Sequence, residues 1–356
     1  MQKNLTNKKK NNDAYTFIDL FAGIGGFRTA LTRNGGTCVF SSEWDKNSQK
    51  SYFDNYNEMP EGDITKIDAK DIPKHDIICA GFPCQAFSVS GKRLGFDDTR
   101  GTLFRDVARI AKHHQPKVLF LENVKNLLRH DGGNTITVIL NTLEEIGYTP
   151  FVKMLKSSDF NVPQARERIY IVCFRKDLGI TEFDYPEPVA NTKVVKDILE
   201  KEPVDSSLYI NRNDIDMYGI SKKIIDPRKP LQIGKINKGG QGERIYSIDA
   251  AGATLSAYGG GAAAKTGAYF IDGKVRKLTP RECARMQGYS DEFILPDKKN
   301  TAFKQFGDSV SVPVLEAIME RIIITCPALL SSKSKVIVQV GKENINQLSL
   351  DSSYAK

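Results

Sequence analysis

Residues 16–27 read TFIDLFAGIGGF, and this stretch decides the fold. The apolar run at 16–21 predicts a buried strand, and the glycines after it predict a tight turn into a helix. Glycines at such a turn let a ligand approach the backbone closely at the carboxyl edge of a sheet. The stretch therefore predicts an α/β fold that binds a nucleotide-like ligand.

The first 175 residues alternate short apolar runs with helical patterns, which is typical of a parallel sheet covered by helices. Near-continuous apolar runs predict strands that are buried on both faces. We expect these strands at 16–21, 38–42, 76–80, 118–122, 151–155 and 168–174. Helices are expected between them, for example at 103–113 and 136–145.

The character of the sequence changes after residues 185–188, which read YPEP. Residues 234–273 hold ten glycines in 40 positions, so this segment is too loop-rich to continue the sheet. A helical apolar pattern returns around 306–321 and predicts a helix that packs back on the first domain. We expect a first domain at 13–190, a second domain with its hinge at 191–303, the returning helix at 304–328, and flexible tails at 1–12 and 329–356.

Positive charge is concentrated in the second half of the chain. The net charge is +8, and the stretches 222–244 and 265–285 hold seven and six Lys or Arg against two acidic residues each. A basic face of this kind suits phosphate binding, although a solvated basic surface gives the same pattern.

Composition argues against several classes of protein. The chain is 40% hydrophobic and 26% charged, and no apolar run approaches the roughly 20 residues that span a bilayer. The basic N-terminus lacks the apolar stretch of a secretory signal. The six cysteines form no C-x-x-C pair and the four histidines do not complete zinc spacing, so neither disulfides nor a metal site are expected. We expect a cytoplasmic protein without membrane contact.

Acidic and apolar residues follow the strands of the predicted sheet. Glu43 ends the second strand, 20 residues after Gly23, where a carboxylate can accept hydrogen bonds from a ribose. Asp63 is expected at a third strand end, where it could bond an adenine amino group. The same layout serves nicotinamide cofactors, but Arg28 stands where their third glycine would fall. Phe21, Trp44 and Ile64 would form the apolar walls of the cofactor pocket. Taken singly, Phe21 and Ile64 are also typical of core residues.

Cys84 is the candidate nucleophile. It follows Pro83 just past the strand expected at 76–80, so its side chain would face the crevice at the carboxyl edge. The alternative is a small buried hydrophobe, the commonest fate of a free cysteine. The next strand ends in Glu122, and Arg166 and Arg168 place fixed positive charge nearby. A cysteine, an acid and arginines on one rim suit covalent catalysis.

Six motifs occur in the order seen in one enzyme family: DLFAGIGGF, GFPCQAFS, ENV, QARERIY, RKLTPRECARMQGY and FGDSV. On these motifs the chain resembles the bacterial cytosine-5 DNA methyltransferases over roughly residues 14–325. Further stretches, KGGQGERIYS and TLSAYGGG among them, are most similar to the members that act on GCGC. The resemblance implies a Rossmann-like methyltransferase domain with a mixed, mostly parallel sheet and a smaller loop- and strand-rich DNA-recognition domain. It also implies S-adenosylmethionine as cofactor and duplex DNA as substrate.

The resemblance further implies a role for each candidate residue. Cys84 adds to carbon 6 of a flipped-out cytosine while Glu122 holds or donates a proton at ring nitrogen 3, and carbon 5 then takes the methyl group. Arg168 bonds the cytosine carbonyl oxygen, and Arg166 supports the loop or the thiolate. The implied cofactor contacts are Phe21, Gly23, Gly25, Glu43, Trp44, Asp63, Ile64, Pro83, Leu103 and Asp308.

DNA contacts are expected from the glycine-rich segment and from the loop that follows Cys84. Gln241 and Arg244 can bond base edges in the major groove, although Arg244 alone is equally typical of a phosphate contact. The resemblance implies GCGC as the target with its inner cytosine methylated. Residues 88–102 are expected to close over the flipped base. The implied DNA-binding set is Ser88, Ser90, Gln241, Arg244 and Tyr258, of which Ser90 and Gln241 enter the duplex.

Asp308 departs from the family pattern, which usually has asparagine in this motif near the cofactor. An ionised aspartate only accepts hydrogen bonds, whereas asparagine also donates them. Contact with the carboxylate of the cofactor would be unfavourable, so the departure predicts weaker cofactor binding with catalysis retained.

Other functions stay open on sequence alone. A nicotinamide-dependent oxidoreductase accounts for the first 80 residues but leaves the cysteine, glutamate and arginine motifs unexplained. A cytosine-5 methyltransferase of transfer RNA shares the catalytic motifs but does not need the glycine-rich segment. A DNA-binding protein without catalysis is excluded only if Cys84 reacts. We expect a monomeric bacterial enzyme at the nucleoid, compatible with a companion restriction endonuclease that acts on the same site without direct contact.

Overall fold

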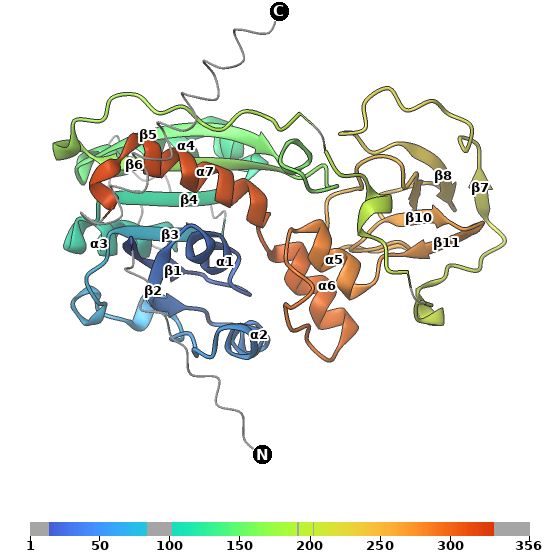
Figure 1. Ribbon diagram of the computed structural model, residues 1–356, viewed down its shortest axis with the longest axis horizontal. Helices are drawn as coiled ribbons and strands as arrows, with labels where there is room; N and C mark the ends of the chain where they lie inside the picture. The colour runs from blue at the N-terminus through green and yellow to red at the C-terminus, as the bar shows by residue number, and fades with distance from the viewer. Residues whose placement is uncertain (1–13, 84–101, 191, 202, 331–356) are drawn as a thin grey trace, which may run out of the picture.

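The chain folds into a larger unit on an α/β sheet and a smaller unit on a second sheet (Figure 1). The computed structural model describes residues 14–83, 102–190, 192–201 and 203–330. Within them the larger unit holds a six-stranded sheet in the order β2-β1-β3-β4-β6-β5. Its strands are β1 (Tyr15–Leu20), β2 (Gly36–Ser42), β3 (Ile77–Gly81), β4 (Val118–Val124), β5 (Tyr148–Lys156) and β6 (Glu167–Arg175).

The sheet is mixed and mostly parallel. Strands β1 to β4 run parallel to one another, whereas β6 is antiparallel to both β4 and β5. This arrangement confirms the predicted fold class. Each of the six expected strands is present, with bounds that differ by no more than three residues.

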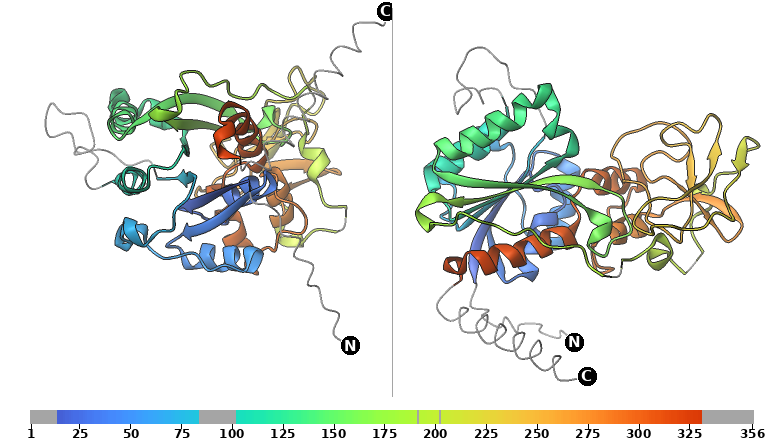
Figure 2. Two further views of the ribbon diagram at one scale, coloured as in Figure 1. Left: turned by 60° about the vertical axis from the view of Figure 1, so that its left-hand side comes forward. Right: turned by 90° about the horizontal axis from the view of Figure 1, so that it is seen from above.

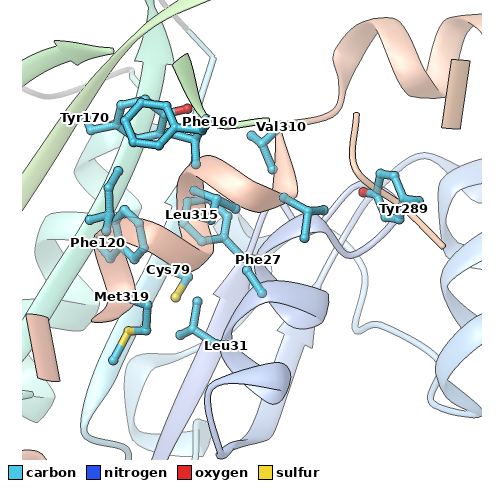
Figure 3. Packing of buried hydrophobic residues seen from close by; sticks show 14 of the residues in the cluster. Phe27, Leu31, Cys79, Phe120, Phe160, Tyr170, Tyr289, Val310, Leu315 and Met319 are labelled. Atoms are coloured by element: carbon cyan, nitrogen blue, oxygen red, sulfur yellow. The ribbon is translucent and has the colours of Figure 1, made fainter. Parts of the chain in front are cut away.

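Each face of the sheet has its own core, because alternate residues of a strand point to opposite faces. On one face Phe17 and Phe120 pack against α1 (Gly26–Arg33) and α7 (Val312–Thr325), as the side chains of Phe27, Leu31 and Leu315 in Figure 3 illustrate. On the other face Ile18 and Leu119 pack against α3 (Phe104–His114) and α4 (Asn134–Glu145). Seen from above in Figure 2, the sheet lies between α4 and α7.

The smaller unit is built on a five-stranded sheet in the order β11-β10-β9-β8-β7. The glycine-rich segment contributes β8, β9 and β10 to it, and a small core of isoleucines such as Ile233 and Ile245 lies on the sheet. This agrees with the expected loop- and strand-rich unit, while the exact boundaries at 190 and 303 stay a prediction. The elements are β7 (Ile215–Met217), β8 (Gln232–Ile236), β9 (Arg244–Tyr246), β10 (Ala268–Ile271), β11 (Lys274–Lys277), α5 (Pro280–Met286) and α6 (Lys299–Asp308).

The single helix expected around 306–321 is wrong. The helix α6 ends at Asp308 and α7 begins at Val312. Pro313 lacks a backbone N–H and is tolerated only in the first turn of a helix, so the chain must break before it. The expected return to the larger unit is nevertheless present, because α7 packs against α1 in the same core. The longest helix in the described ranges, α7, has 14 residues. None of the helices in these ranges is long and apolar enough to cross a membrane.

His75 is a buried titratable residue just before β3. It is 5% exposed, its Nδ1 donates to the carbonyl oxygen of Pro73 at 2.7 Å, and its Nε2 has no hydrogen-bond partner among the described residues. Burial, with the nearby His114 as a smaller cause, lowers the pKa of His75 to about 4. Folding therefore favours the neutral ring.

A pH titration of stability tests this residue. The neutral ring stabilises the fold fully above the ordinary histidine pKa of about 6.5, and that stabilisation is lost as the pH falls towards 4. In the wild type, His75 should lower the unfolding free energy by about 2 kcal/mol as the pH falls from about 7 to about 5. His75→Asn should lack this part of the decrease, as measured by urea unfolding. The matched control is His113→Asn, which removes an exposed histidine of α3. An unchanged slope in His75→Asn would contradict the assignment.

Candidate active site

The carboxyl ends of the parallel strands bring the candidate residues to one edge of the sheet. The chain leaves β1 at Phe21, β2 at Glu43 and β3 at Phe82, and β4 carries Glu122 near its end. Parallel strands place these exits side by side, and Gly81 pairs in register with Glu122. The topology therefore assembles one site from four segments that are far apart in the sequence.

Glu43 ties the turn after β2 to the glycine turn after β1. One carboxylate oxygen accepts a hydrogen bond from the backbone N–H of Gly23 at 2.8 Å, and the other accepts from the N–H of Asp45 at 2.8 Å. Burial raises the pKa of Glu43, although these two hydrogen bonds oppose the shift. Each oxygen keeps a lone pair, so the carboxylate can still accept from a ligand.

The glycine turn after β1 is open at Gly23. A side chain added at Gly23 would meet nothing within 4 Å, and the backbone there is left-handed with φ +56°, so the turn is open. Trp44 stands next to Glu43 with 78% of its surface exposed, and Phe21 is half-buried. An exposed indole face beside a carboxylate suits the aromatic base and ribose of a nucleotide-like group.

Gly25 is required for a different reason. A Cβ at this residue would lie 2.3 Å from the ring of Tyr56, and the backbone is left-handed with φ +83°. Packing against α2 (Lys46–Tyr56) therefore explains this glycine without any ligand. A contact between Gly25 and the cofactor stays a prediction.

The expected strand end at Asp63 is wrong. Among the described residues the segment makes only an isolated bridge between Ser42 and Glu61, and Asp63 caps a short 3-10 helix, Ile64–Lys66. Its carboxylate accepts from the backbone N–H and hydroxyl of Thr65, a local pattern that aspartate favours over extending a strand. Ile64 is buried in the core that covers one face of the sheet, so its role as a cofactor wall stays a prediction.

Glu122 and Arg168 form a buried ion pair at the same edge. Because β6 is antiparallel to β4, its first residues lie beside the last residues of β4, and Arg168 pairs in register with Val124. Arg168 Nε lies 3.1 Å from Glu122 Oε1, and both side chains are largely buried. Burial raises the pKa of Glu122, while the charges of Arg168 and Arg166 oppose the shift. The acid thus retains its proton more readily than an exposed glutamate.

Arg166 is fully buried and bonds carbonyl oxygens instead of an acid. Its guanidinium donates to Leu255 at 3.3 Å, to Gly307 at 3.2 Å and to Ser309 at 2.5 Å. Burial, reinforced by the charge of Arg168, lowers the pKa of Arg166 to about 10, so it stays charged at neutral pH. These contacts join the start of β6 to the smaller unit and to the end of α6; its expected role beside the thiolate stays a prediction.

Asn123 is a site residue that the motif pattern left without a role. Its amide donates to the carbonyl oxygen of Phe82 at 2.7 Å in a buried position, two residues before Cys84. Its place in the sequence is the signal that could have found it, since an amide directly follows the candidate acid at a strand end. Pro83 is exposed on the same turn, and Leu103 precedes α3. Cys84, Ser88, Ser90 and most of the expected closing loop lie outside the described residues.

A cleft of about 370 Å³ in the smaller unit gathers the expected DNA-reading residues. Gln241, Arg244 and Tyr258 line it, and all three are exposed. Ala165, next to Arg166, also lines the cleft, so its wall reaches the start of β6 in the larger unit. Within the described residues the structure thus brings the reading residues and the Glu122–Arg168 edge to adjoining surfaces.

Family comparison decides the family to which the chain belongs. The model of the family described as C-5 cytosine-specific DNA methylase matches residues 15–324. The chain is a C-5 cytosine-specific DNA methyltransferase. Members of this family use S-adenosylmethionine, which agrees with the open turn beside Glu43 and Trp44. The expected enzyme class, cofactor and DNA substrate are therefore confirmed, and the oxidoreductase alternative is wrong.

Relatives of this methyltransferase match nearly its whole length. It is 52% identical to the type II methyltransferase M.HhaI of Haemophilus parahaemolyticus over 87% of this chain and 95% of that protein. It is 45% identical to the type II methyltransferase M.HpaII of Haemophilus parainfluenzae over 87% and 90% of the two chains. The solved structure of Dnmt2 methyltransferase from S. pombe shares its fold, with a TM-score of 0.66 at 18% identity over 87% and 98% of the chains.

Removal of the Arg166 side chain tests its structural role in this methyltransferase. Arg166→Ala removes a charged donor from two buried carbonyl oxygens and one part-buried carbonyl oxygen, so we expect the unfolding free energy to fall by about 3 kcal/mol in urea titrations. The matched control is Arg33→Ala, which breaks an exposed pair with Glu316 and should cost about 0.5 kcal/mol or less. Equal stability of the two variants would contradict the role.

Proposed function

We propose that this enzyme methylates carbon 5 of the inner cytosine of GCGC in duplex DNA, with Cys84 as the covalent nucleophile. The observation that carries the proposal is the buried Glu122–Arg168 pair, which lies beside the turn that leads into Cys84. An acid whose pKa is raised by burial and a fixed cation at one edge suit a ring that must be activated by addition of a nucleophile.

Each group of the pair has a distinct part in the proposed reaction. The Cys84 thiolate forms a bond to carbon 6 while Glu122 supplies or holds the proton at ring nitrogen 3. Arg168 donates to the cytosine carbonyl oxygen and offsets the charge that develops there. When bound, S-adenosylmethionine would supply the electrophilic methyl group to carbon 5, and its sulfur–methyl bond would break to leave a neutral thioether. Loss of the carbon 5 proton to a base then lets the bond to Cys84 break and restores the ring.

The cofactor is proposed to lie against the turn that Glu43 and Gly23 form. Glu43 accepts hydrogen bonds from the ribose, and Trp44 and Phe21 cover the aromatic base. The proposal rests on the open space at Gly23 and on the exposed indole. The same proposal includes Gly25, Asp63, Ile64, Pro83, Leu103 and Asp308 as the remaining contacts.

Sequence choice is proposed to reside in the cleft of the smaller unit. Arg244 reads guanine from the major groove, Gln241 and Ser90 enter the duplex beside the flipped base, and Ser88 and Tyr258 support these contacts. The exposure of Gln241, Arg244 and Tyr258 supports this, as does the 52% identity to M.HhaI. The glycine-rich unit that carries the cleft favours DNA over transfer RNA as substrate.

The cellular setting follows from this substrate. We propose a monomer that acts on DNA in the cytoplasm, as part of a restriction-modification system whose endonuclease cuts the same site without contacting this chain. The type II methyltransferases among its relatives support the proposal.

Mapping the methylated base tests the target and the nucleophile. Duplexes with and without GCGC are incubated with labelled S-adenosylmethionine, and the label is expected on the inner cytosine only. Cys84→Ala should fold normally and lose turnover, and a duplex with 5-fluorocytosine at the target should trap the wild type as a covalent adduct. Methyl transfer without any adduct through Cys84 would refute the covalent step.

The pH profile of turnover tests Glu122. Burial raises its pKa, so the protonated share falls as the pH rises through that value, and wild-type turnover should fall with it. Glu122→Gln should lower kcat by about 100-fold or more and remove this alkaline limb. A variant that keeps the wild-type profile would show that another group sets the limb.

Substitution of Arg244 tests sequence choice. We expect Arg244→Ala to lose about 10-fold or more in discrimination between GCGC and single-base variants, measured as kcat/KM on each duplex. Arg212→Ala is the control, since Arg212 is an exposed arginine of the same unit that pairs with Asp214. An unchanged preference in Arg244→Ala would assign Arg244 to phosphate contacts.

A further inference from the structure

Lys304 of α6 lies between two carboxylates that come from distant parts of the chain. Its Nζ is 3.8 Å from Asp45 Oδ2, at the start of α2, and 3.5 Å from Asp308 Oδ2, one helical turn further along α6. The three side chains are 39%, 32% and 53% exposed, so water screens them only in part. The Lys304 ammonium is thus the shared counter-ion of Asp45 and Asp308.

Asp45 belongs to the turn on which the proposed cofactor rests. Its backbone N–H donates to Glu43 at 2.8 Å, and its Oδ1 accepts from the backbone N–H of Ser48 and so caps α2. Glu43 in turn holds the N–H of Gly23. If Asp45 moves, its hydrogen bond to Glu43 moves Glu43 as well, and the hydrogen bond between Glu43 and Gly23 then shifts the open glycine turn.

Asp308 is poorly placed for an ionised acid. It is the last residue of α6, where the partial negative charge of the helix end disfavours a carboxylate, and burial raises its pKa. The charged or titratable groups that face Asp308 are Lys304, Arg166 and Asp45, and Tyr258 lies near Lys304. Because Arg166 donates its hydrogen bonds to carbonyl oxygens, Lys304 is the cation that approaches Asp308 within ion-pair distance among the described residues.

Neutral contacts hold α2 against α6 and against the segment that precedes α6. Ser51 of α2 donates to Gln305 of α6 at 3.1 Å in a buried position, and Asn55 exchanges two hydrogen bonds with the backbone of Ile294. Loss of Lys304 would therefore not separate α2 from α6. It would leave Asp45 and Asp308 facing each other across a fixed gap without their shared counter-ion.

We propose that Lys304 is a positioning residue for cofactor binding: by offsetting the repulsion between Asp45 and Asp308, it holds the Glu43–Asp45 turn in place. The inference rests on the proposed cofactor site at Glu43 and adds to it a residue that need not touch the cofactor. Asp308 makes the enzyme dependent on Lys304, because a neutral side chain at 308 would remove the repulsion.

Calorimetric titration of the full-length protein with S-adenosylmethionine, without DNA, measures this role apart from activity. We expect Lys304→Gln to raise the Kd about five-fold at low salt, and the difference to shrink at about 1 M salt. The double variant Lys304→Gln with Asp308→Asn should return to within about two-fold of Asp308→Asn alone, since the repulsion is gone. The melting temperature of each variant is recorded alongside.

Two control variants separate the possible failures. Lys299→Gln removes another exposed lysine of α6, one that pairs with Asp205, and should leave the Kd unchanged. Glu43→Gln should weaken binding if the cofactor lies at this turn. An unchanged Kd in Glu43→Gln overturns the proposed cofactor site and this inference with it. Weakened binding in Glu43→Gln with an unchanged Kd in Lys304→Gln, or a double variant without recovery, overturns the inference alone.

Discussion

The antiparallel pairing of β6 with β4 is the constraint on which the site depends. In a sheet whose other central strands run parallel, one reversed strand brings its first residues to the edge where its neighbours end. Arg168 thereby meets Glu122 although 46 residues separate them in the sequence. Had β6 run parallel to β4, the arginine would lie at the opposite edge and the acid would be buried without a partner.

Burial then sets the chemistry of the pair. Removing Glu122 from water disfavours its charged form and raises its pKa, and the nearby arginines oppose part of that shift. The two arginines have different partners: Arg168 faces the acid, whereas Arg166 donates to three carbonyl oxygens. If an acidic side chain paired with both Arg166 and Arg168, their charges would no longer oppose the rise in the pKa of Glu122.

The end of the chain completes the site from the other side. The carbonyls that Arg166 contacts belong to the smaller unit and to the junction between α6 and α7, and α6 also contacts α2 through Ser51 and Gln305. The end of α6 and the junction after it thus contact both Arg166, a neighbour of Glu122, and α2, which follows the turn at Glu43.

The sequence by itself determined the sheet, its strands and the chemical class of the site. Apolar periodicity and glycine turns are local signals, so the sequence alone predicts all six strands and the residues at their ends. The tertiary structure alone decided the partners of Arg166, the role of Asn123, the cap at Asp63 and the place of Lys304 between two acids. These depend on contacts between residues far apart in the sequence and on competition between local hydrogen bonds and strand pairing, neither of which a periodic pattern encodes.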